Sequence, residues 1–310
     1  MSDTHTVVNM TPLQLEQLRI ATPQGRKYKT PVGDLPSVTS ITKLMPGTAL
    51  MWWAAGEAAK DAMTLERHHE VGDWLAEVID ATGDTAVPDG EDPLWKKIRS
   101  AHTRSSQKAA DRGTEAHDMV ERYILGDLDH VPDEGNPYFD EFLKAEALLK
   151  SRFLPGTFRW EFAEVAVYNP ELGYAGTLDI GYSGLVPIEG GIEARLFGIA
   201  DLKTRAKDNR AFPGAALQVW ALANCPYAAL TGPIHPRRED DTLDSVFTWK
   251  QPMPTFDEAF VIVANPDGGA MYEVPLSGPK AEALSGQFQS LLHTAWFEAQ
   301  GDPFDGKVEL

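Results

Sequence analysis

The sequence predicts a layered α+β or α/β domain with a helical N-terminal portion, because its elements follow one another in blocks. Residues 36–150 show helical periodicity, whereas runs rich in β-branched and apolar residues follow from residue 155 onward. Strands and helices do not alternate regularly, so a doubly wound nucleotide-binding fold is not expected. We expect an N-terminal tail and first strand over residues 1–35, a helical portion over 36–150 and a core sheet with a C-terminal helix over 151–310, together forming one compact domain.

The N-terminal half is expected to be mostly helical. Residues 1–20 are expected to form a mobile tail with a short helical patch near its end, and the proline-punctuated stretch 28–41 is expected to be extended. Thr48 is a candidate N-terminal cap, and Gly126 is a stop signal. The periodicity predicts helices over residues 49–63, 65–82, 94–125 (with one break) and 137–149.

The C-terminal half is expected to supply the sheet. Apolar and β-branched runs predict strands over residues 157–168, 173–182 and 196–204. A helix is expected next, over residues 213–223. A hairpin of strands 260–264 and 271–274 follows, and a helix over 279–299 closes the fold.

Composition favours a cytosolic globular protein. With 310 residues, of which 43% are hydrophobic, the chain can bury a core, and no apolar run has the length of a membrane span. The polar start Met1-Ser2-Asp3-Thr4 does not resemble a signal peptide. The single cysteine, Cys225, excludes an internal disulfide and any four-cysteine zinc or iron–sulfur site. A cytoplasmic location, without a membrane partner, is the default expectation.

Charge is distributed unevenly along the chain. The net charge of −18 opposes general affinity for DNA, whose phosphates require clustered lysine and arginine. One basic cluster nevertheless holds six basic residues against one acid, namely Lys96, Lys97, Arg99, Arg104, Lys108 and Arg112. A second begins in a predicted strand and comprises Lys203, Arg205, Lys207 and Arg210. These clusters are either solvated surfaces, which is the common case, or a local track for DNA phosphates.

Tryptophans near the first basic cluster are candidates for contact with nucleic acid. Trp52, Trp53 and Trp95 could each stack on an unpaired base. Core packing is expected for at least two of them. Trp95, which precedes Lys96 and Lys97, is the strongest stacking candidate.

Two acids stand in apolar predicted strands. Asp179 follows Gly176-Thr177-Leu178, and Asp201 follows Ile199-Ala200. Because side chains alternate along a strand, Asp201 and Lys203 share one face. Carboxylates on neighbouring strands suit a hard cation such as Mg²⁺ or Mn²⁺, and an amine beside them suits a phosphate. An ion pair with an arginine, or a capped turn, is the alternative explanation for an acid at position 179.

Two helical segments add polar residues to this set. His117 and Glu121 lie four residues apart, after Gly113, so on a helix they share one face. Gln218 lies among apolar neighbours in the helix predicted over residues 213–223, where it needs a polar partner. Taken singly, each of these residues also has an ordinary explanation as surface decoration or a satisfied polar group.

The order of these motifs resembles the RecB-type branch of the PD-(D/E)XK nuclease superfamily. A Gly-x-x-x-His-x-x-x-Glu motif ends at Glu121, Gly-Thr-x-Asp ends at Asp179, Asp-x-Lys ends at Lys203, and a helix with Gln218 follows. The stretch Pro-Ser-Val-Thr-Ser-Ile at residues 36–41, ahead of a tryptophan-bearing helix, looks like the N-terminal portion of phage members. The resemblance implies a restriction-endonuclease-like fold, in which helices flank a mixed central sheet.

The resemblance also implies how the matching residues would act. His117, Asp179 and Asp201 would bind a catalytic Mg²⁺ or Mn²⁺, with the carbonyl of Leu202 as a further ligand. Lys203 would stabilise the attacking hydroxide or the developing charge on the phosphate. A metal-dependent phosphodiesterase needs these two functions, a bound cation and a fixed positive charge.

Two other residues receive supporting roles from the resemblance, and two departures qualify it. Glu121 would bind or orient a second metal, and Gln218 would contact the site or the DNA. Members of the branch usually carry tyrosine four residues after this glutamine, where the present chain has Leu222. The cysteines of the iron–sulfur members are absent, so a form without an iron–sulfur cluster is expected.

The leading hypothesis is a DNA exonuclease that resects ends in phage recombination or replication. DNA is the expected partner, the resemblance implies a single-strand annealing protein as another, and a homo-oligomer is allowed. A site- or structure-specific endonuclease is the nearest alternative. A non-catalytic DNA-binding protein that keeps the fold is a second alternative, and a metal hydrolase acting on other substrates is a third, which would suit the acidity better.

Overall fold

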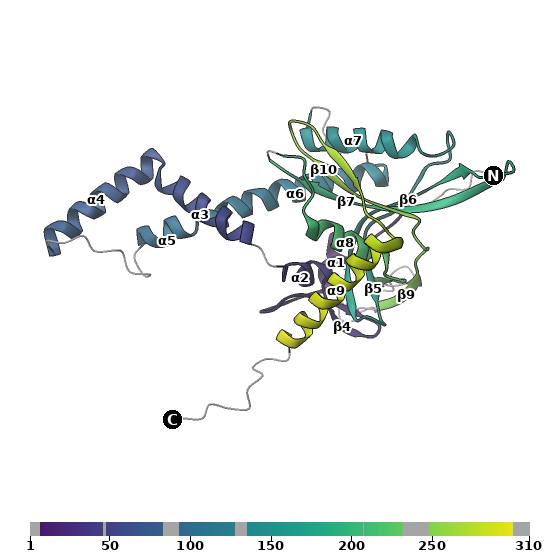
Figure 1. Ribbon diagram of the computed structural model, residues 1–310, viewed down its shortest axis with the longest axis horizontal. Coiled ribbons are helices and arrows are strands. Elements are labelled where there is room, and N and C mark those ends of the chain that lie inside the picture. Colours follow the sequence, from purple (N-terminus) through teal and green to yellow (C-terminus); the bar gives the residue numbers. More distant parts are fainter. Residues whose placement is uncertain are drawn as a thin grey trace, which may run out of the picture. The chain divides into compact units, whose positions relative to one another are not determined.

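The computed structural model describes residues 7–45, 48–82, 93–127, 135–206, 208–231 and 248–299 of a mixed α/β chain (Figure 1). The chain divides into two compact units. One comprises residues 1–45 and 115–310 and is called the core unit here; the other comprises residues 46–114 and is called the helical unit. In the described part of the chain, no helix is both long enough and apolar enough to cross a membrane.

The core unit is built on a mixed sheet. In the described residues it has eight strands, seven of them in the order β11-β10-β7-β6-β5-β8-β9, while β1 pairs with β5. The β10–β7 and β1–β5 pairs are parallel and the other pairs are antiparallel. The strands are β1 Val8–Asn9, β5 Arg159–Asn169, β6 Tyr174–Pro187, β7 Glu193–Thr204, β8 Tyr227–Thr231, β9 Thr248–Pro252, β10 Glu258–Ala264 and β11 Ala270–Glu273.

Most of this sheet agrees with the sequence-based expectations. The three long strands β5, β6 and β7 match the three predicted runs, and β10 pairs with β11 in the predicted hairpin. The short strands β8 and β9 were not predicted. Each has five residues. Strand β8 pairs with β5, which comes much earlier in the chain, and β9 pairs with β8. A local sequence pattern does not record such pairings.

The N-terminal segment is not a free tail from residue 7 onward, which corrects the expectation for residues 1–20. Strand β1 joins the main sheet, and helix α1 (Pro12–Leu18) buries Leu15 and Leu18. A separate antiparallel sheet then follows, of β2 (Arg19–Thr22), β3 (Gly25–Thr30) and β4 (Gly33–Pro36). The backbone of Gly25 and Gly33 has φ of 122° and 117°, so the two tight connections of this sheet need glycine.

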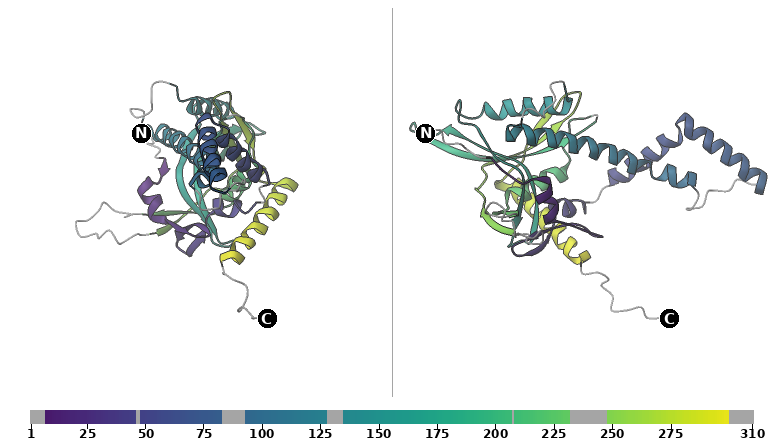
Figure 2. Two further views of the ribbon diagram at one scale, coloured as in Figure 1. Left: turned by 90° about the vertical axis from the view of Figure 1, so that its left-hand side faces the viewer. Right: turned by 180° about the vertical axis from the view of Figure 1, so that it is seen from behind.

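Helices cover the two faces of the main sheet (Figures 1 and 2). Alternate residues of β7 belong to different apolar clusters, Ile199 to one and Leu202 to the other, as expected when successive side chains point to opposite faces. The first cluster includes α2 (Val38–Thr42), α8 (Pro213–Ala223) and α9 (Gly278–Ala299). The second includes α7 (Pro137–Lys150) and the C-terminal part of α6 (Ala101–Leu125).

The helical unit contains α3 (Thr48–Ala62), α4 (Leu65–Thr82), α5 (Pro93–Arg99) and the first part of α6. The expected break falls at Ser100, between α5 and α6, and α6 continues through Gly113 to the predicted stop at Gly126. Ion pairs connect the helices of this unit, and they join Arg67 to Asp61, Lys97 to Glu70 and Arg104 to Asp61, while Arg67 also pairs with Glu70 within α4.

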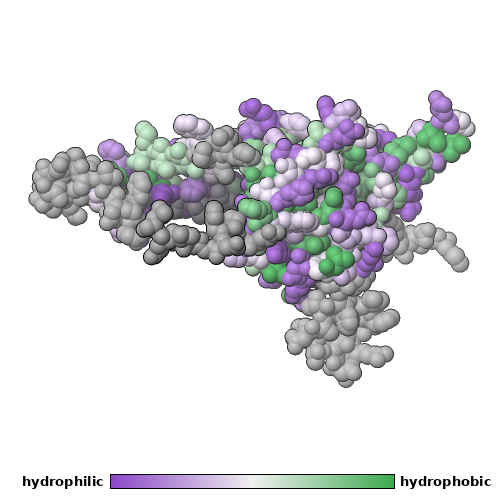
Figure 3. Space-filling model, turned by 60° about the horizontal axis from the view of Figure 1, so that its bottom comes forward, coloured by the Kyte–Doolittle hydropathy of each residue, from purple (hydrophilic) through white to green (hydrophobic). Residues whose placement is uncertain are grey.

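The tryptophans of α3 do not form a core, which corrects the expectation of core packing. Trp52 is 79% exposed and Trp53 is 37% exposed, while the side chain of Trp95 lies outside the described residues. Over the face drawn in Figure 3, hydrophobic residues are scattered among hydrophilic ones.

A glycine in β7 limits how the sheet can be packed. A Cβ atom at Gly198 would lie 2.3 Å from the ring of Tyr182. That ring is fully buried, and its hydroxyl donates a hydrogen bond to Glu258, which pairs with Arg152 at 2.7 Å. The ring therefore has little room to move.

We expect Gly198→Ala to lower the free energy of unfolding by about 1–3 kcal/mol, the usual cost of overpacking a core. Urea unfolding followed by circular dichroism measures this change. Gly286→Ala on α9 is the matched control, because a Cβ atom there meets nothing within 4 Å and alanine is the better helix former. A Gly198→Ala variant as stable as the control would contradict the packing argument.

Candidate metal centre

The site forms where two central strands separate. The register of β6 and β7 ends with Ile180 opposite Ala200. Asp179 directly precedes that last pair on β6, and Asp201 directly follows it on β7, so both carboxylates stand at the same open end. Asp179 Oδ2 then accepts a hydrogen bond from the backbone N–H of Leu202 at 3.2 Å. The side chain thus occupies the position that a continuing β ladder would have taken.

Helix α6 brings His117 to the same backbone position. Its Nε2 donates to the carbonyl oxygen of Leu202 at 2.9 Å, although the two residues are separated by 85 positions in the sequence. The other ring nitrogen, Nδ1, lies 3.5 Å from Asp179 Oδ2 and 3.4 Å from Glu164 Oε1. A histidine that binds a metal through one nitrogen usually donates its other N–H to a carbonyl or carboxylate, and this geometry meets that requirement.

Glu164 on β5 is the residue that sequence reasoning missed. It has φ of 49°, a left-handed conformation that glutamate rarely adopts and that is the sole such case among the described non-glycine residues. Strained backbone of this kind occurs preferentially at functional sites. The sequence does contain an indication of this residue, namely a single acid in an apolar strand, as for Asp179. Glu164 is the one acid within the run Phe162-Ala163-Glu164-Val165-Ala166.

Three side chains form a group that can hold a cation. One ligand atom from each of His117, Glu164 and Asp179 lies within 4.8 Å of the others. All three are half-buried, and two carboxylate oxygens with one imidazole nitrogen form a mixed donor set. Carboxylates suit Mg²⁺ and Mn²⁺, while imidazole is the better ligand for transition metals, so the set fits Mn²⁺ at least as well as Mg²⁺.

Asp201 was expected in this first group, but in the structure its carboxylate is held by Lys203. The Lys203 Nζ lies 2.8 Å from Oδ1 and 2.6 Å from Oδ2 of Asp201, which is 2% exposed. The two side chains share one face of β7, as the alternation predicts. The side chain of Leu202 points to the other face of β7, where it packs in the apolar cluster that includes α6 and α7. The expectation that Asp201 binds the same ion therefore requires Lys203 to shift or to share the carboxylate.

The electrostatics of the site reflect its burial. Burial opposes a charge on His117, but the carboxylates of Asp179 and Glu164 outweigh it and raise the pKa of His117 to about 9. Burial raises the pKa of Asp179. It also raises the pKa of Asp201 to about 6, with Lys203 opposing the rise and Asp179 adding to it. Several carboxylates crowded into a poorly solvated site gain most from a bound divalent cation.

Glu121 lies one helical turn beyond His117 and belongs to the same neighbourhood. Burial and the nearby charge of Glu164 raise the pKa of Glu121, and Asn9 donates a hydrogen bond to it. Gln218 is half-buried on α8, and its side chain makes no hydrogen bond to the described residues. The structure therefore places Glu121 beside the carboxylates but gives no contact that would join Gln218 to them.

The predicted DNA-contacting residues fall into several groups. Lys97 and Arg104 form ion pairs with Glu70 and Asp61 inside the helical unit, at 2.8 Å each, and their side chains remain partly exposed. Lys96, Arg99 and Lys108 are exposed, and Arg112 is half-buried. In the second basic cluster, Arg205 pairs with Asp208 at 2.8 Å and lies over the Phe212 ring. Arg210 is exposed, and Lys207 lies outside the described residues.

Comparison with known proteins gives little beyond the geometry. No family model matches the chain, and no curated protein matches it. Among solved structures, the chain is similar to SSO0001 with 14% sequence identity and a TM-score of 0.25. The match covers 52% of this chain and 59% of SSO0001, which is less than two thirds of that protein's length. A similarity this distant does not indicate an activity.

Proposed function

We propose that this chain is a metal-dependent deoxyribonuclease of the RecB-type branch of the PD-(D/E)XK superfamily, acting as an exonuclease. The observation that carries the proposal is the meeting of His117, Glu164 and Asp179 beside the Asp201–Lys203 pair, at the open end of two central strands. The ordered motifs from Gly113 to Gln218 favour this branch, and its end-resecting members favour an exonuclease over an endonuclease.

The proposed division of labour follows from the contacts. His117, Glu164 and Asp179 would hold Mg²⁺ or Mn²⁺, and Asp201 would join them by sharing its carboxylate between the ion and Lys203. The bound metal would polarise the phosphate and supply hydroxide at neutral pH. Leu202 fixes both the His117 ring and the Asp179 carboxylate through its backbone, so these two ligands are oriented before a metal arrives.

Lys203 would provide the fixed positive charge. Its side chain is 34% exposed, so its amino group is partly accessible, while Asp201 and Asp179 outweigh the effect of burial and raise its pKa. It is therefore charged at neutral pH. Negative charge accumulates on the phosphate oxygens during hydrolysis, and a preoriented cation stabilises that charge without reorganisation.

Digestion of DNA with Mg²⁺ or Mn²⁺ tests the proposal. We expect end-labelled linear DNA to lose its label progressively and covalently closed circular DNA to remain intact, with EDTA abolishing the reaction. Asp201→Ala should be inactive under the same conditions. Cleavage of the circle would instead favour the endonuclease alternative. No metal-dependent cleavage of either DNA would favour the non-catalytic alternative.

A role in phage recombination or replication, with a single-strand annealing protein as partner, rests on the resemblance alone. Retention of the chain by an immobilised protein of this kind, and not by the bare support, would support that part of the proposal, and no retention would contradict it.

A further inference from the structure

The helical unit presents an aromatic side chain to solvent. Trp52 on α3 is 79% exposed, and its neighbour Trp53 is 37% exposed. Consecutive residues on a helix point about 100° apart, so the Trp52 and Trp53 side chains leave α3 in different directions. An indole in water gains free energy when a flat apolar surface covers it. Trp52 is therefore a candidate contact residue rather than part of a core.

Charge is segregated within the same unit. Helix α4 carries five acidic residues and one basic residue, whereas the stretch from Lys96 to Arg112 carries six basic residues and one acid. On a chain of net charge −18, this stretch is a place where a polyanion can approach. Helix α5, which holds the first of these basic residues, packs against α3, the helix of Trp52.

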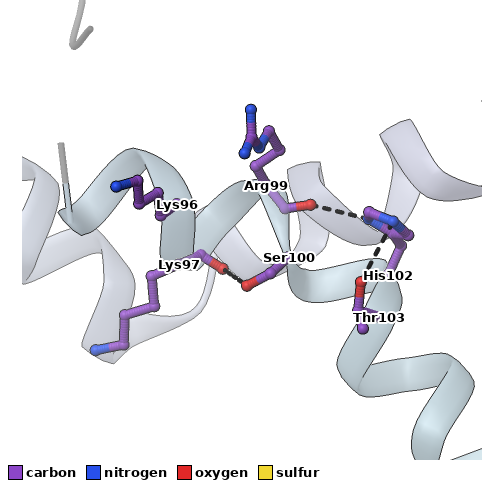
Figure 4. A pocket seen from close by; sticks show the side chains of 6 residues that line it. All are labelled: Lys96, Lys97, Arg99, Ser100, His102 and Thr103. Carbon is purple, nitrogen blue, oxygen red and sulfur yellow. Dashed lines mark hydrogen bonds between the residues drawn. The ribbon is translucent and has the colours of Figure 1, made fainter. Parts of the chain in front are cut away.

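A cavity that is broadly open to solvent, with about 540 Å³ of space, lies at the junction of α5 and α6. It is lined by Lys96, Lys97, Arg99, Ser100, His102 and Thr103 (Figure 4). Its size is in the range of small-molecule sites, and the exposed cations Lys96 and Arg99 in its lining can attract phosphate oxygens.

The backbone of this cavity is held by local hydrogen bonds. The Ser100 hydroxyl donates to the Lys97 carbonyl at 3.1 Å, and a ring nitrogen of His102 bonds to the Arg99 carbonyl at 2.8 Å. Lys97 forms an ion pair with Glu70, and in Figure 4 its amino group points away from the guanidinium of Arg99. Arg99 makes no ion pair with the described residues. The cavity is thus fixed by contacts that leave the Arg99 guanidinium available to an anion.

We propose that the helical unit binds single-stranded DNA, with a backbone phosphate in the α5–α6 cavity and an unpaired base stacked on Trp52. The choice of DNA as the polymer rests on the proposed nuclease function. Basic grooves combined with exposed aromatic side chains are the general means of binding single strands. Duplex DNA is disfavoured as the ligand because its base faces are already stacked and cannot cover an indole.

Fluorescence anisotropy of labelled oligo-dT in EDTA tests this site without interference from cleavage. We expect Trp52→Ala to weaken binding about 5- to 150-fold, the range found for stacking on a base, with Trp52→Phe retaining part of the affinity. We expect Arg99→Ala to weaken binding and to reduce the slope of log K against log salt by about 0.7, the value for one lost contact with a single strand. Trp52→Ala should leave that slope unchanged.

Two matched variants control for general effects. Phe297→Ala removes an aromatic side chain that is 59% exposed on α9, and Arg159→Ala removes an exposed arginine at the start of β5; both lie in the core unit. Both should bind oligo-dT like the wild type. Circular dichroism of every variant establishes that it is folded, and Trp52→Phe keeps the test valid if Trp52→Ala does not fold.

Several results would overturn the inference. They are failure of the wild type to bind oligo-dT, equal binding of a matched duplex, wild-type affinity in both Trp52→Ala and Arg99→Ala, or preferential binding of poly-glutamate, which would indicate an acidic protein partner. The outcome is separable from the proposed function. Metal-dependent cleavage without oligo-dT binding would contradict only this inference. Oligo-dT binding without any cleavage would contradict only the nuclease proposal.

Discussion

Lys203→Ala is expected to lower the rate of metal-dependent DNA cleavage by about 10²–10³, the usual loss when one preoriented group that stabilises transition-state charge is removed. The physical reason is that its ammonium, held 2.6–2.8 Å from both oxygens of Asp201, stands at the open end of β6 and β7 where the phosphate would lie. DNA binding should persist, because the variant keeps the other basic residues that we propose contact DNA. Single-turnover cleavage of end-labelled DNA and a binding assay in Ca²⁺ measure the two effects separately.

Lys280→Ala is the matched control for this prediction. Lys280 is an exposed lysine near the start of α9, and its removal changes the net charge equally without touching the strand ends. It should cleave like the wild type. Cleavage by Lys203→Ala at the wild-type rate would show that the amine has no part in the reaction.

The second large effect concerns the metal. His117→Ala and Glu164→Gln should each weaken Mn²⁺ binding by about tenfold or more, because even groups that only orient metal ligands contribute 10- to 100-fold to affinity. His117 and Glu164 each offer one ligand atom to the group with Asp179. His117→Ala removes that atom, whereas Glu164→Gln replaces a charged carboxylate oxygen by a neutral amide oxygen, which binds a divalent cation more weakly. Isothermal titration of the metal-free protein with Mn²⁺ measures the affinity directly, independently of any cleavage.

Glu171→Gln supplies the control for Glu164→Gln. Glu171 is an exposed residue of the turn between β5 and β6, and the same chemical change there should leave Mn²⁺ affinity unaltered. If Glu164→Gln bound Mn²⁺ as tightly as Glu171→Gln does, Glu164 would not be a ligand. The strained backbone of Glu164 would then need another explanation.

Helices with strong local signals were predictable from the sequence. The predicted bounds of two helices coincide with those of α4 (Leu65–Thr82) and α8 (Pro213–Ala223). Pro213 stands at the first position of α8, where its missing N–H costs nothing. Such signals act within one or two turns, so they do not depend on the rest of the chain.

The N-terminal segment and the short strands were not predictable in the same way. Strand β1 has two residues, and it is a strand only because β5 lies beside it. Strand β8 likewise depends on pairing with β5 and β9. Short segments of this kind acquire their conformation from long-range backbone pairing, which overrides weak local propensity.

For the candidate site, the sequence by itself determined that Asp201 and Lys203 share one face of a strand, because side-chain alternation is fixed by backbone geometry alone. It also determined that His117 and Glu121 share a helix face. Only the tertiary structure decided that His117 bonds to the Leu202 carbonyl and that Glu164 completes the cluster. It also decided that Trp52 faces solvent. These outcomes depend on strand register, on where β6 and β7 separate and on which helix packs on which face. All three are set by the burial of apolar side chains from distant parts of the chain, which no local pattern records.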